Sequence, residues 1–354
     1  MARLFGREWS RKELQERVGR MEQLAGVRLS VLSDGPERGV RIADITTGSG
    51  FAFTVLIDRG MDIGPASFNG RALAWQSSTG AVGPWFYQPE EYEWLYGFHG
   101  GLLVTCGLTA AGAPSQDEDG THGLHGRISN LPAFQVNTGS RWVGDDYEVW
   151  IKGQVRETSV FGHDLLLTRI ITARLGESRL LVEDVVENVG FKRSPLMVLY
   201  HCNFGFPVVD EGSELVVNDQ SVRPRDEVAA PGLSTHAAFE KPQAEYAEQV
   251  FYHDPIPDEE GFCTAAIVNR ALDGGEGLAA YVRYRKAELP NLIEWKQMGV
   301  RDYVVGLEPA NCLPEGRLAE RTRGTLQFLA PGERREFHLE LGAVTGEEAI
   351  AALG

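Results

Sequence analysis

Alternation of apolar and polar residues is the main pattern along this chain. Between residues 335 and 341, phenylalanine and leucine side chains alternate with charged or polar ones. A strand needs this period of two when one face of its sheet is packed and the other meets water. The same period occurs in residues 147–151 and 278–284. The pattern therefore predicts strands in all three segments.

Short segments rich in β-branched and aromatic residues fill the middle of the chain, and Gly, Pro, Asn or Asp bound them, as is typical of strands joined by turns. Strands do not alternate with regular crossover helices, so a doubly wound parallel sheet is disfavoured. We predict an all-β fold, a large antiparallel β-sandwich. Further strands are expected at residues 27–32, 51–57, 165–173, 180–186, 196–201, 263–268 and 303–307.

Two helix signals lie at the ends of the chain. Ser10 followed by Glu13 forms a capping-box pattern, and apolar residues then recur at roughly helical spacing up to Leu24. Thr345 and Glu348 repeat the capping pattern before a short apolar run. We expect a helical extension within residues 1–25 and a short C-terminal helix.

One domain, residues 1–354, is predicted because no repeat, low-complexity tract or long linker divides the chain. Two stretches lack a strand pattern. Residues 83–98 are dense in acids and aromatic rings, and these rings either pack on a sugar or close the end of the sandwich: Trp85, Tyr87, Trp94 and Tyr96. Residues 223–257 are polar and compatible with a lid, an oligomer arm or plain surface.

Composition and charge narrow the function classes. The 354 residues are 43% hydrophobic, enough for a large core, and the net charge of −16 repels nucleic-acid phosphates but not a neutral sugar. The four cysteines are widely spaced and predict neither a disulfide scaffold nor a thiolate zinc site. Without a signal peptide or membrane-spanning run, we expect a cytoplasmic protein with no nucleic-acid or membrane partner. Oligomeric state is not predicted.

A glycine-rich segment from Asp119 to Ala133 carries two histidines, His122 and His125. Glycines give irregular backbone on which imidazoles can point together into a cleft that a substrate approaches closely. The alternative is a turn whose histidines cap nearby carbonyl groups. Composition alone leaves both interpretations open.

Two strands carry the other candidate groups. His201 lies on an apolar strand, and alternation places Asn203 on the same face. Glu308 ends a nearly apolar strand just before Pro309. Partial burial there would raise the pKa of the carboxyl and improve it as a base near neutrality. Alternatively, His201 is a hydrogen-bonded core residue and Glu308 a salt-bridged strand end.

These motifs together resemble those of aldose 1-epimerases, the galactose mutarotase-like superfamily. The resemblance rests on Leu124-His125-Gly126, His201-Cys202-Asn203-Phe204 and Leu307-Glu308-Pro309, in order and approximate spacing. The runs at residues 57–64 and 122–127 are most similar to an incompletely characterised bacterial branch. The chain departs from the galactose mutarotase pattern at Arg127, where a second glycine is usual, and after His201.

The resemblance implies a β-supersandwich that interconverts the anomers of a sugar. Glu308 would be the general base at the O1 hydroxyl, His201 the general acid at the ring oxygen, and His125 would fix the sugar by hydrogen bonds. His122 and Asn203 would be further sugar ligands. No metal or organic cofactor is implied.

Each of three charged residues has two alternative roles. Arg59 and Asp62 lie in the run that the bacterial branch shares and could grip vicinal hydroxyls, although such residues also form ordinary ion pairs in turns. Arg127 could recognise an anionic sugar substituent or pair with one of the many acids.

Two other functions stay open at the sequence level. If His122, His125, His201 and Glu308 converge, three imidazoles and a carboxylate could hold zinc, manganese or iron in a metal-dependent sugar isomerase, epimerase or lyase. Alternatively, the chain is a non-catalytic sugar-binding module. Retention of both an acid and a base argues against that, because binding alone requires neither.

Overall fold

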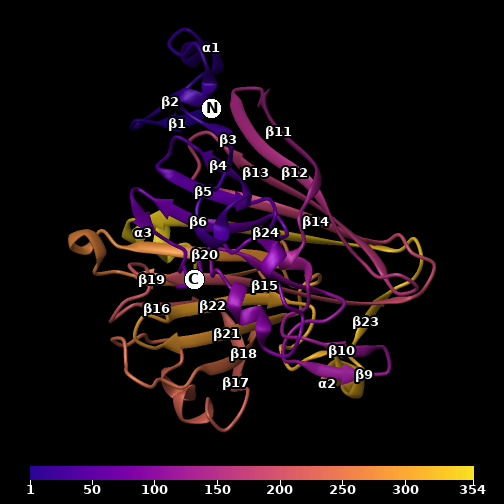
Figure 1. Cartoon of the computed structure of the whole chain (residues 1–354). Helices are drawn as coiled ribbons and strands as arrows, with labels where there is room; N and C mark the ends of the chain where they lie inside the picture. The colour runs from indigo at the N-terminus through magenta and orange to yellow at the C-terminus, as the bar shows by residue number, and fades with distance from the viewer.

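The computed structural model describes all residues from 1 to 354. Strands hold 49% of them and helices only 12%, which confirms the predicted all-β class. Figure 1 shows long strands crossing the molecule, with only short helical segments beside them. No helix combines the length and the hydropathy needed to cross a membrane.

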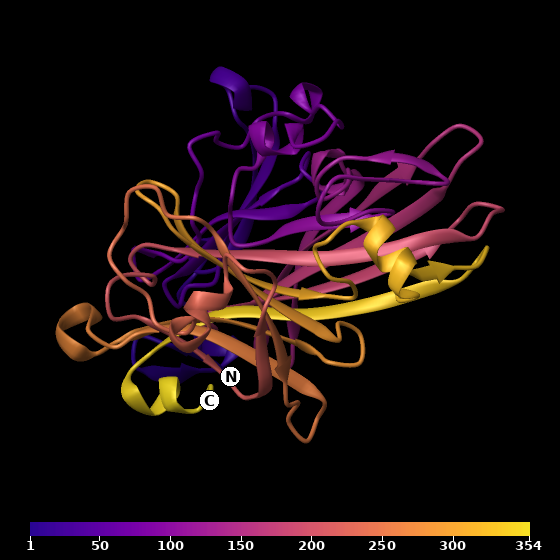
Figure 2. The same ribbon diagram turned by 90° about the horizontal axis from the view of Figure 1, so that it is seen from below.

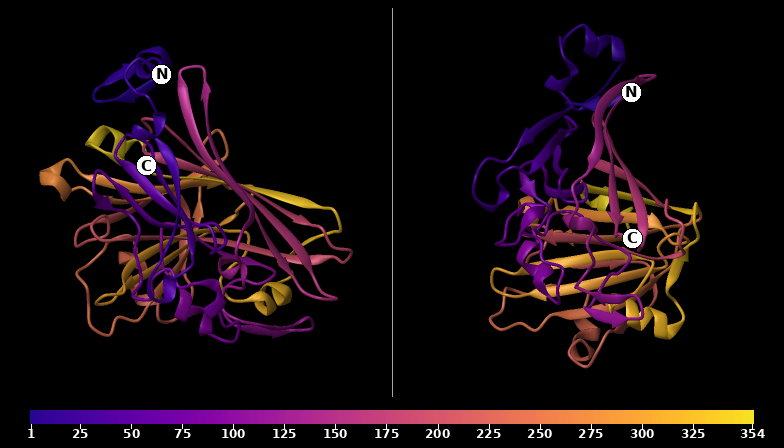
Figure 3. Two further views of the ribbon diagram at one scale, coloured as in Figure 1. Left: turned by 45° about the horizontal axis from the view of Figure 1, so that its top comes forward. Right: turned by 45° about the vertical axis from the view of Figure 1, so that its right-hand side comes forward.

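Three antiparallel sheets form the body of the molecule (Figures 1 and 3). The eight-stranded sheet has the order β11 (Phe134–Val143), β12 (Asp146–Thr158), β13 (Asp164–Arg174), β14 (Arg179–Asn188), β24 (Arg334–Thr345), β20 (Leu278–Arg285), β19 (Phe262–Asn269) and β16 (Glu214–Val217). The seven-stranded sheet has the order β17 (Asp219–Pro224), β18 (Gln249–Pro255), β21 (Asn291–Met298), β22 (Tyr303–Ala310), β15 (Ser194–Gly205) and β23 (Gln327–Leu329), with β8 (Val104–Leu108) also paired to β15.

The third sheet is smaller, and the other elements are two hairpins and three short α-helices. The five-stranded sheet has the order β3 (Gly26–Val31), β4 (Arg41–Thr46), β5 (Phe51–Leu56), β6 (Asp62–Phe68) and β7 (Arg71–Ala72). Two hairpins, β1 (Ala2–Leu4) with β2 (Arg7–Trp9) and β9 (Ser115–Asp117) with β10 (Gly120–His122), lie apart from the large sheets. The helices are α1 (Arg11–Gln15), α2 (Arg317–Arg323) and α3 (Glu347–Ala351).

The pattern of burial explains why the strands form where they do. In β13 every second residue is buried, as its alternating sequence predicts. In β15 all positions are buried, because the strand is covered on both faces. Val198, Tyr200, Cys202 and Phe204 join the main core, whereas Met197 and Leu199 join a second, smaller cluster. His201 points to the side of that smaller cluster.

The ten strand segments expected from the sequence are all present, although most strands extend one to several residues further. Both expected terminal helices are present, but their bounds or caps differ from those expected. Ser10 and Glu13 do form the capping box, but α1 ends at Gln15 and the β1–β2 hairpin precedes it. At the C-terminus Thr345 ends β24 instead of capping α3, whose N-cap is Gly346.

The segment 223–257 is also more ordered than the sequence suggested. It ends in β18, which pairs on one side with β17 and on the other with β21. Because β18 is continuous with the seven-stranded sheet, this segment contributes residues to the cavity described next.

Candidate active site

Two neighbouring strands place His201 beside Glu308. Cys202 of β15 pairs with Leu307 of β22, so the residues next to them face each other across the ladder. The His201 Nε2 atom lies 3.1 Å from the Glu308 Oε1 atom, and both side chains are almost fully buried. The strand of Glu308 continues through Pro309, so this carboxyl lies inside a sheet and not at a strand end.

Gly306 makes room for this pair. It lies two residues before Glu308 on the same face of β22, and a Cβ atom there would stand 2.8 Å from Glu308 Oε1 and 3.1 Å from the Cε1 atom of His201. Any larger residue would displace one of the two side chains. The glycine is therefore part of what lets the carboxyl and the imidazole meet.

A loop after β10 brings His125 to the same place. His125 adopts a positive φ of 56° and the following Gly126 one of 72°. A Cβ atom on Gly126 would stand 2.2 Å from the Ala110 carbonyl oxygen, so only glycine fits there. The His125 amide donates to the Gly112 carbonyl, and the ring of His125 lies 5.7 Å from that of His201, centroid to centroid.

His125, His201 and Glu308 line one cavity of about 600 Å³. This volume is suited to a small ligand such as a sugar. Aromatic rings form much of the wall: Trp94 stacks on Phe98 and lies beside His125, and Trp295 lies beside His201. Such rings offer faces on which the C–H groups of a sugar can pack.

The rim of this cavity is polar. Arg225 donates to the Glu248 Oε1 atom over 3.3 Å, and the Trp295 indole donates to Glu248 Oε2 over 2.7 Å. Asp226 and Glu315 also line the opening. These residues offer donors and acceptors to sugar hydroxyls.

Burial sets the protonation of the three central groups. It raises the pKa of Glu308 well above its ordinary value, and the Glu248 carboxylate adds to this effect. It lowers the pKa of His201 well below the usual range, with His125 adding to the effect, and lowers the pKa of His125 to about 4. Burial therefore favours the neutral form of each group, which is a protonated carboxyl for Glu308 and an uncharged imidazole for each histidine.

The sequence did not single out Arg225, Glu248 or Trp295. Arg225 and Glu248 flank a loop inside the segment that we left undecided, and they meet only because β18 joins the sheet. The alternation of Ile293 and Trp295 in β21, both facing the cavity, was a signal that could have been found.

His122 and Arg127 line a different cavity, on the other side of the His125 loop. The His122 Nε2 atom lies 3.0 Å from Asp117 Oδ1. The four-ligand cluster of the metal-dependent alternative is therefore not assembled, since only His125, His201 and Glu308 share a cavity.

Arg59, Asp62 and Asn203 were expected to bind the sugar, but they do not line the cavity. Their side chains contact other parts of the protein instead. Arg59 is buried and donates to the carbonyl oxygens of Ser129, Val82 and Gly97. Asp62 is buried against Arg169, 3.0 Å away. Asn203 donates to the Gly101 and His201 carbonyls, so it supports the strand of His201.

One group of side chains has the composition of a metal site. His236, His253 and Glu294 place their ligand atoms within 4.8 Å of one another. Glu294 precedes Trp295 in β21, and alternation directs it to the opposite face of the sheet from Glu308. Glu294 already accepts from both histidines, and His253 is held at its other nitrogen by Asp219 at 2.7 Å.

Comparisons with known proteins identify a family and relatives of similar fold. A family model described as "Domain of unknown function (DUF4432)" matches residues 37–343. None of the curated proteins matches the chain. A solved structure from Klebsiella pneumoniae subsp. pneumoniae, provisionally named an aldose 1-epimerase, is 27% identical with a TM-score of 0.86, covering 92% of this chain and 85% of its own.

Two more distant structures show the same fold. The galactose 1-epimerase from Lactobacillus acidophilus is 14% identical with a TM-score of 0.60, covering 91% of this chain and 99% of its own. A galactose mutarotase-like protein from Clostridium acetobutylicum has the same identity, TM-score and coverage. The fold is therefore galactose mutarotase-like, as the motifs implied.

Proposed function

The chain belongs to the family described as a domain of unknown function (DUF4432), and we propose that it is an isomerase that interconverts the α and β anomers of a sugar. The observation that carries the proposal is the 3.1 Å contact of His201 with Glu308 in one cavity with His125. An acid and a base side by side meet the needs of the reaction without a metal or an organic cofactor. We place the enzyme in the cytoplasm, where its four free, buried cysteines would stay reduced.

Each residue has a role in the proposed reaction. The Glu308 carboxylate takes the proton of the O1 hydroxyl while His201 gives a proton to the ring oxygen. The bond from C1 to the ring oxygen breaks, O1 becomes the aldehyde oxygen, and rotation about the C1–C2 bond presents its other face. The same two groups then return the protons in reverse. Neutral His125, whose side chain has no hydrogen-bond partner in the protein, is free to bind a sugar hydroxyl.

The resting pair holds the single proton that this mechanism needs. A protonated Glu308 beside neutral His201 becomes the reactive carboxylate and imidazolium when that proton moves along the 3.1 Å contact. Sugar hydroxyls that enter the cavity stabilise the charged form. The two groups therefore titrate as one unit.

A bell-shaped pH profile is the first expected result. Loss of the shared proton at high pH, through the raised pKa of Glu308, removes the acid. Gain of a second proton at low pH, below the lowered pKa of His201, removes the base. Measured kcat/KM for anomer exchange should fall on both sides of the pH optimum.

In His201→Asn the rate should drop roughly a hundredfold and the bell shape should disappear. An unchanged rate or profile in this variant would refute the role of His201.

The substrate is to be found by screening. Anomer exchange followed by one-dimensional proton NMR across aldoses, ketoses and uronic acids should reveal one class that the enzyme accelerates. Saturable sugar binding with no acceleration in the wild-type protein would instead support a non-catalytic sugar-binding module.

A further inference from the structure

A second cavity, of about 670 Å³, opens on the far side of the loop that carries His125. Five segments distant in sequence line it, within residues 87–89, 109–127, 159–163, 192–195 and 317–328. The views agree that α2 lies beside the β9–β10 hairpin, along the outer ends of the long strands (Figures 1 and 2). The two cavities share a wall, because Gly126 and Arg127 face this one and His125 the other.

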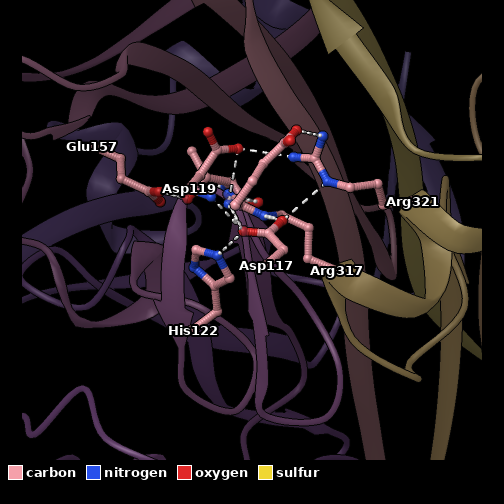
Figure 4. Close-up of polar contacts among 8 residues, drawn as sticks. Asp117, Asp119, His122, Glu157, Arg317 and Arg321 are labelled. Carbon is pink, nitrogen blue, oxygen red and sulfur yellow. Dashed lines mark hydrogen bonds and ion pairs between the residues drawn. The ribbon is translucent and has the colours of Figure 1, made fainter.

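A network of ion pairs holds this cavity in shape (Figure 4). Arg317 of α2 donates to both oxygens of Asp117, over 2.8 and 2.7 Å, and Arg321 donates to Asp119 over 2.8 Å. The side chains of Arg317 and Asp117 are 3% and 1% exposed, so they form a buried joint. Burial alone would raise the pKa of Asp117, but the hydrogen bonds from Arg317 and His122 outweigh it and lower that pKa. The hairpin is therefore fixed to α2.

The cavity carries an excess of positive charge. Five Arg and Lys side chains line it, against the carboxylates of Glu118 and Asp119. Arg321 pairs with both of these and Arg317 with the buried Asp117, so the excess rests on the other three cations. The whole chain has the opposite balance, with 34 Lys and Arg against 50 Asp and Glu. A local reversal of sign inside a concave site attracts anions.

Three of these cations have no carboxylate partner: Arg127, Lys192 and Arg193. The Arg127 guanidinium lies 5.8 Å from the centroid of the Tyr87 ring and that of Arg193 3.9 Å from the Phe328 ring. Lys192 donates one bond of 2.7 Å, to the Phe161 carbonyl oxygen. An arginine held over a ring keeps N–H donors available for an oxyanion, and phosphate is the anion that suits such forks well.

We propose that this cavity is a second ligand site, separate from the cavity of Glu308, and that it binds the phosphate group of a small phosphorylated molecule. Arg127, Lys192 and Arg193 supply the donors. The Phe161 ring also lines the cavity and is 92% exposed, so it is available to cover the remainder of the ligand. The proposal rests on the charges and contacts of this cavity and not on the proposed isomerase activity.

Isothermal titration calorimetry at constant ionic strength tests the proposal. The probes are inorganic phosphate and glucose 6-phosphate, with glucose as the uncharged counterpart. The wild-type protein should bind at least one of the two phosphates saturably. The double variant Arg127→Ala/Arg193→Ala should weaken that binding at least about tenfold, because each substitution removes charged hydrogen bonds to the phosphate. Tighter binding of glucose 6-phosphate than of inorganic phosphate would identify a phosphorylated sugar as the ligand. Tighter binding of inorganic phosphate would identify free phosphate.

The control variant is Arg28→Ala/Arg334→Ala, which removes two positive charges from exposed positions elsewhere. Its phosphate binding should match that of the wild-type protein. No saturable binding by the wild-type protein, or equal weakening in both double variants, would overturn the proposal. So would loss of phosphate binding in Arg225→Ala with none in Arg127→Ala/Arg193→Ala, since Arg225 lines the cavity of Glu308.

Discussion

Glu308→Gln should lower the rate of anomer exchange by roughly a hundredfold to ten-thousandfold, the usual worth of a positioned acid or base. The amide keeps the size of the side chain and can still contact His201, so the fold and the cavity should persist. It cannot accept the O1 proton, and it no longer shares a proton with the imidazole. The loss should therefore appear in kcat, with a small change in KM.

The comparison for this variant is Glu336→Gln, an exposed glutamate of β24 with no part in the cavity. It should have wild-type kcat and KM for the same sugar. If Glu308→Gln retained full activity while its melting temperature matched that of the wild-type protein, Glu308 would not be the base.

Removal of the buried arginine at position 169 should destabilise the protein by about 3–5 kcal/mol. Arg169 is fully buried, donates to both oxygens of Asp184 over 2.8 and 2.6 Å, and pairs with Asp62 at 3.0 Å. Arg169→Met would leave two carboxylates in the core without a positive charge. The Tyr200 hydroxyl also donates to Asp184. One neutral hydroxyl cannot offset the negative charge of that carboxylate once Arg169 is removed.

Arg156→Met is the matched control, because Arg156 makes the same two-pronged contact with Asp164 at the surface, over 2.7 and 2.6 Å. Half of the Arg156 side chain is exposed, so its loss should cost no more than about 1 kcal/mol. Urea unfolding of both variants measures the difference. Equal stability of the two would show that the buried network contributes nothing.

Strands such as β13 and β24 were predictable from the sequence because one face of each strand is packed and the other meets water. Residues 335–341, whose apolar and polar side chains alternate, form part of β24 in the structure. The N-terminal helix was overpredicted because apolar residues at helical spacing after Leu14 also suit a looser segment that packs on the core: Met21 and Leu24 do so from a short turn of 3₁₀ helix and its cap.

Parts of the site could not be predicted because local sequence does not specify direction. His122 and His125 are three positions apart, yet the positive φ of His125 and Gly126 turns them to different cavities. Arg59 and Asp62 have the chemistry to bind hydroxyls, but the same chemistry satisfies buried carbonyls and Arg169. Only the fold decides between these uses. The motifs that resemble aldose 1-epimerases predicted that Glu308 and His201 would meet in one cavity, as they do.

A crystal structure of the Glu308→Gln variant with its sugar tests the central claim most directly. The account predicts the sugar in the cavity between Trp94 and Trp295, with O1 within hydrogen-bond distance of residue 308 and the ring oxygen within that distance of His201. A sugar absent from the cavity of Glu308 and found only in that of Arg127, or one whose O1 and ring oxygen lie beyond the reach of both residues, would contradict it.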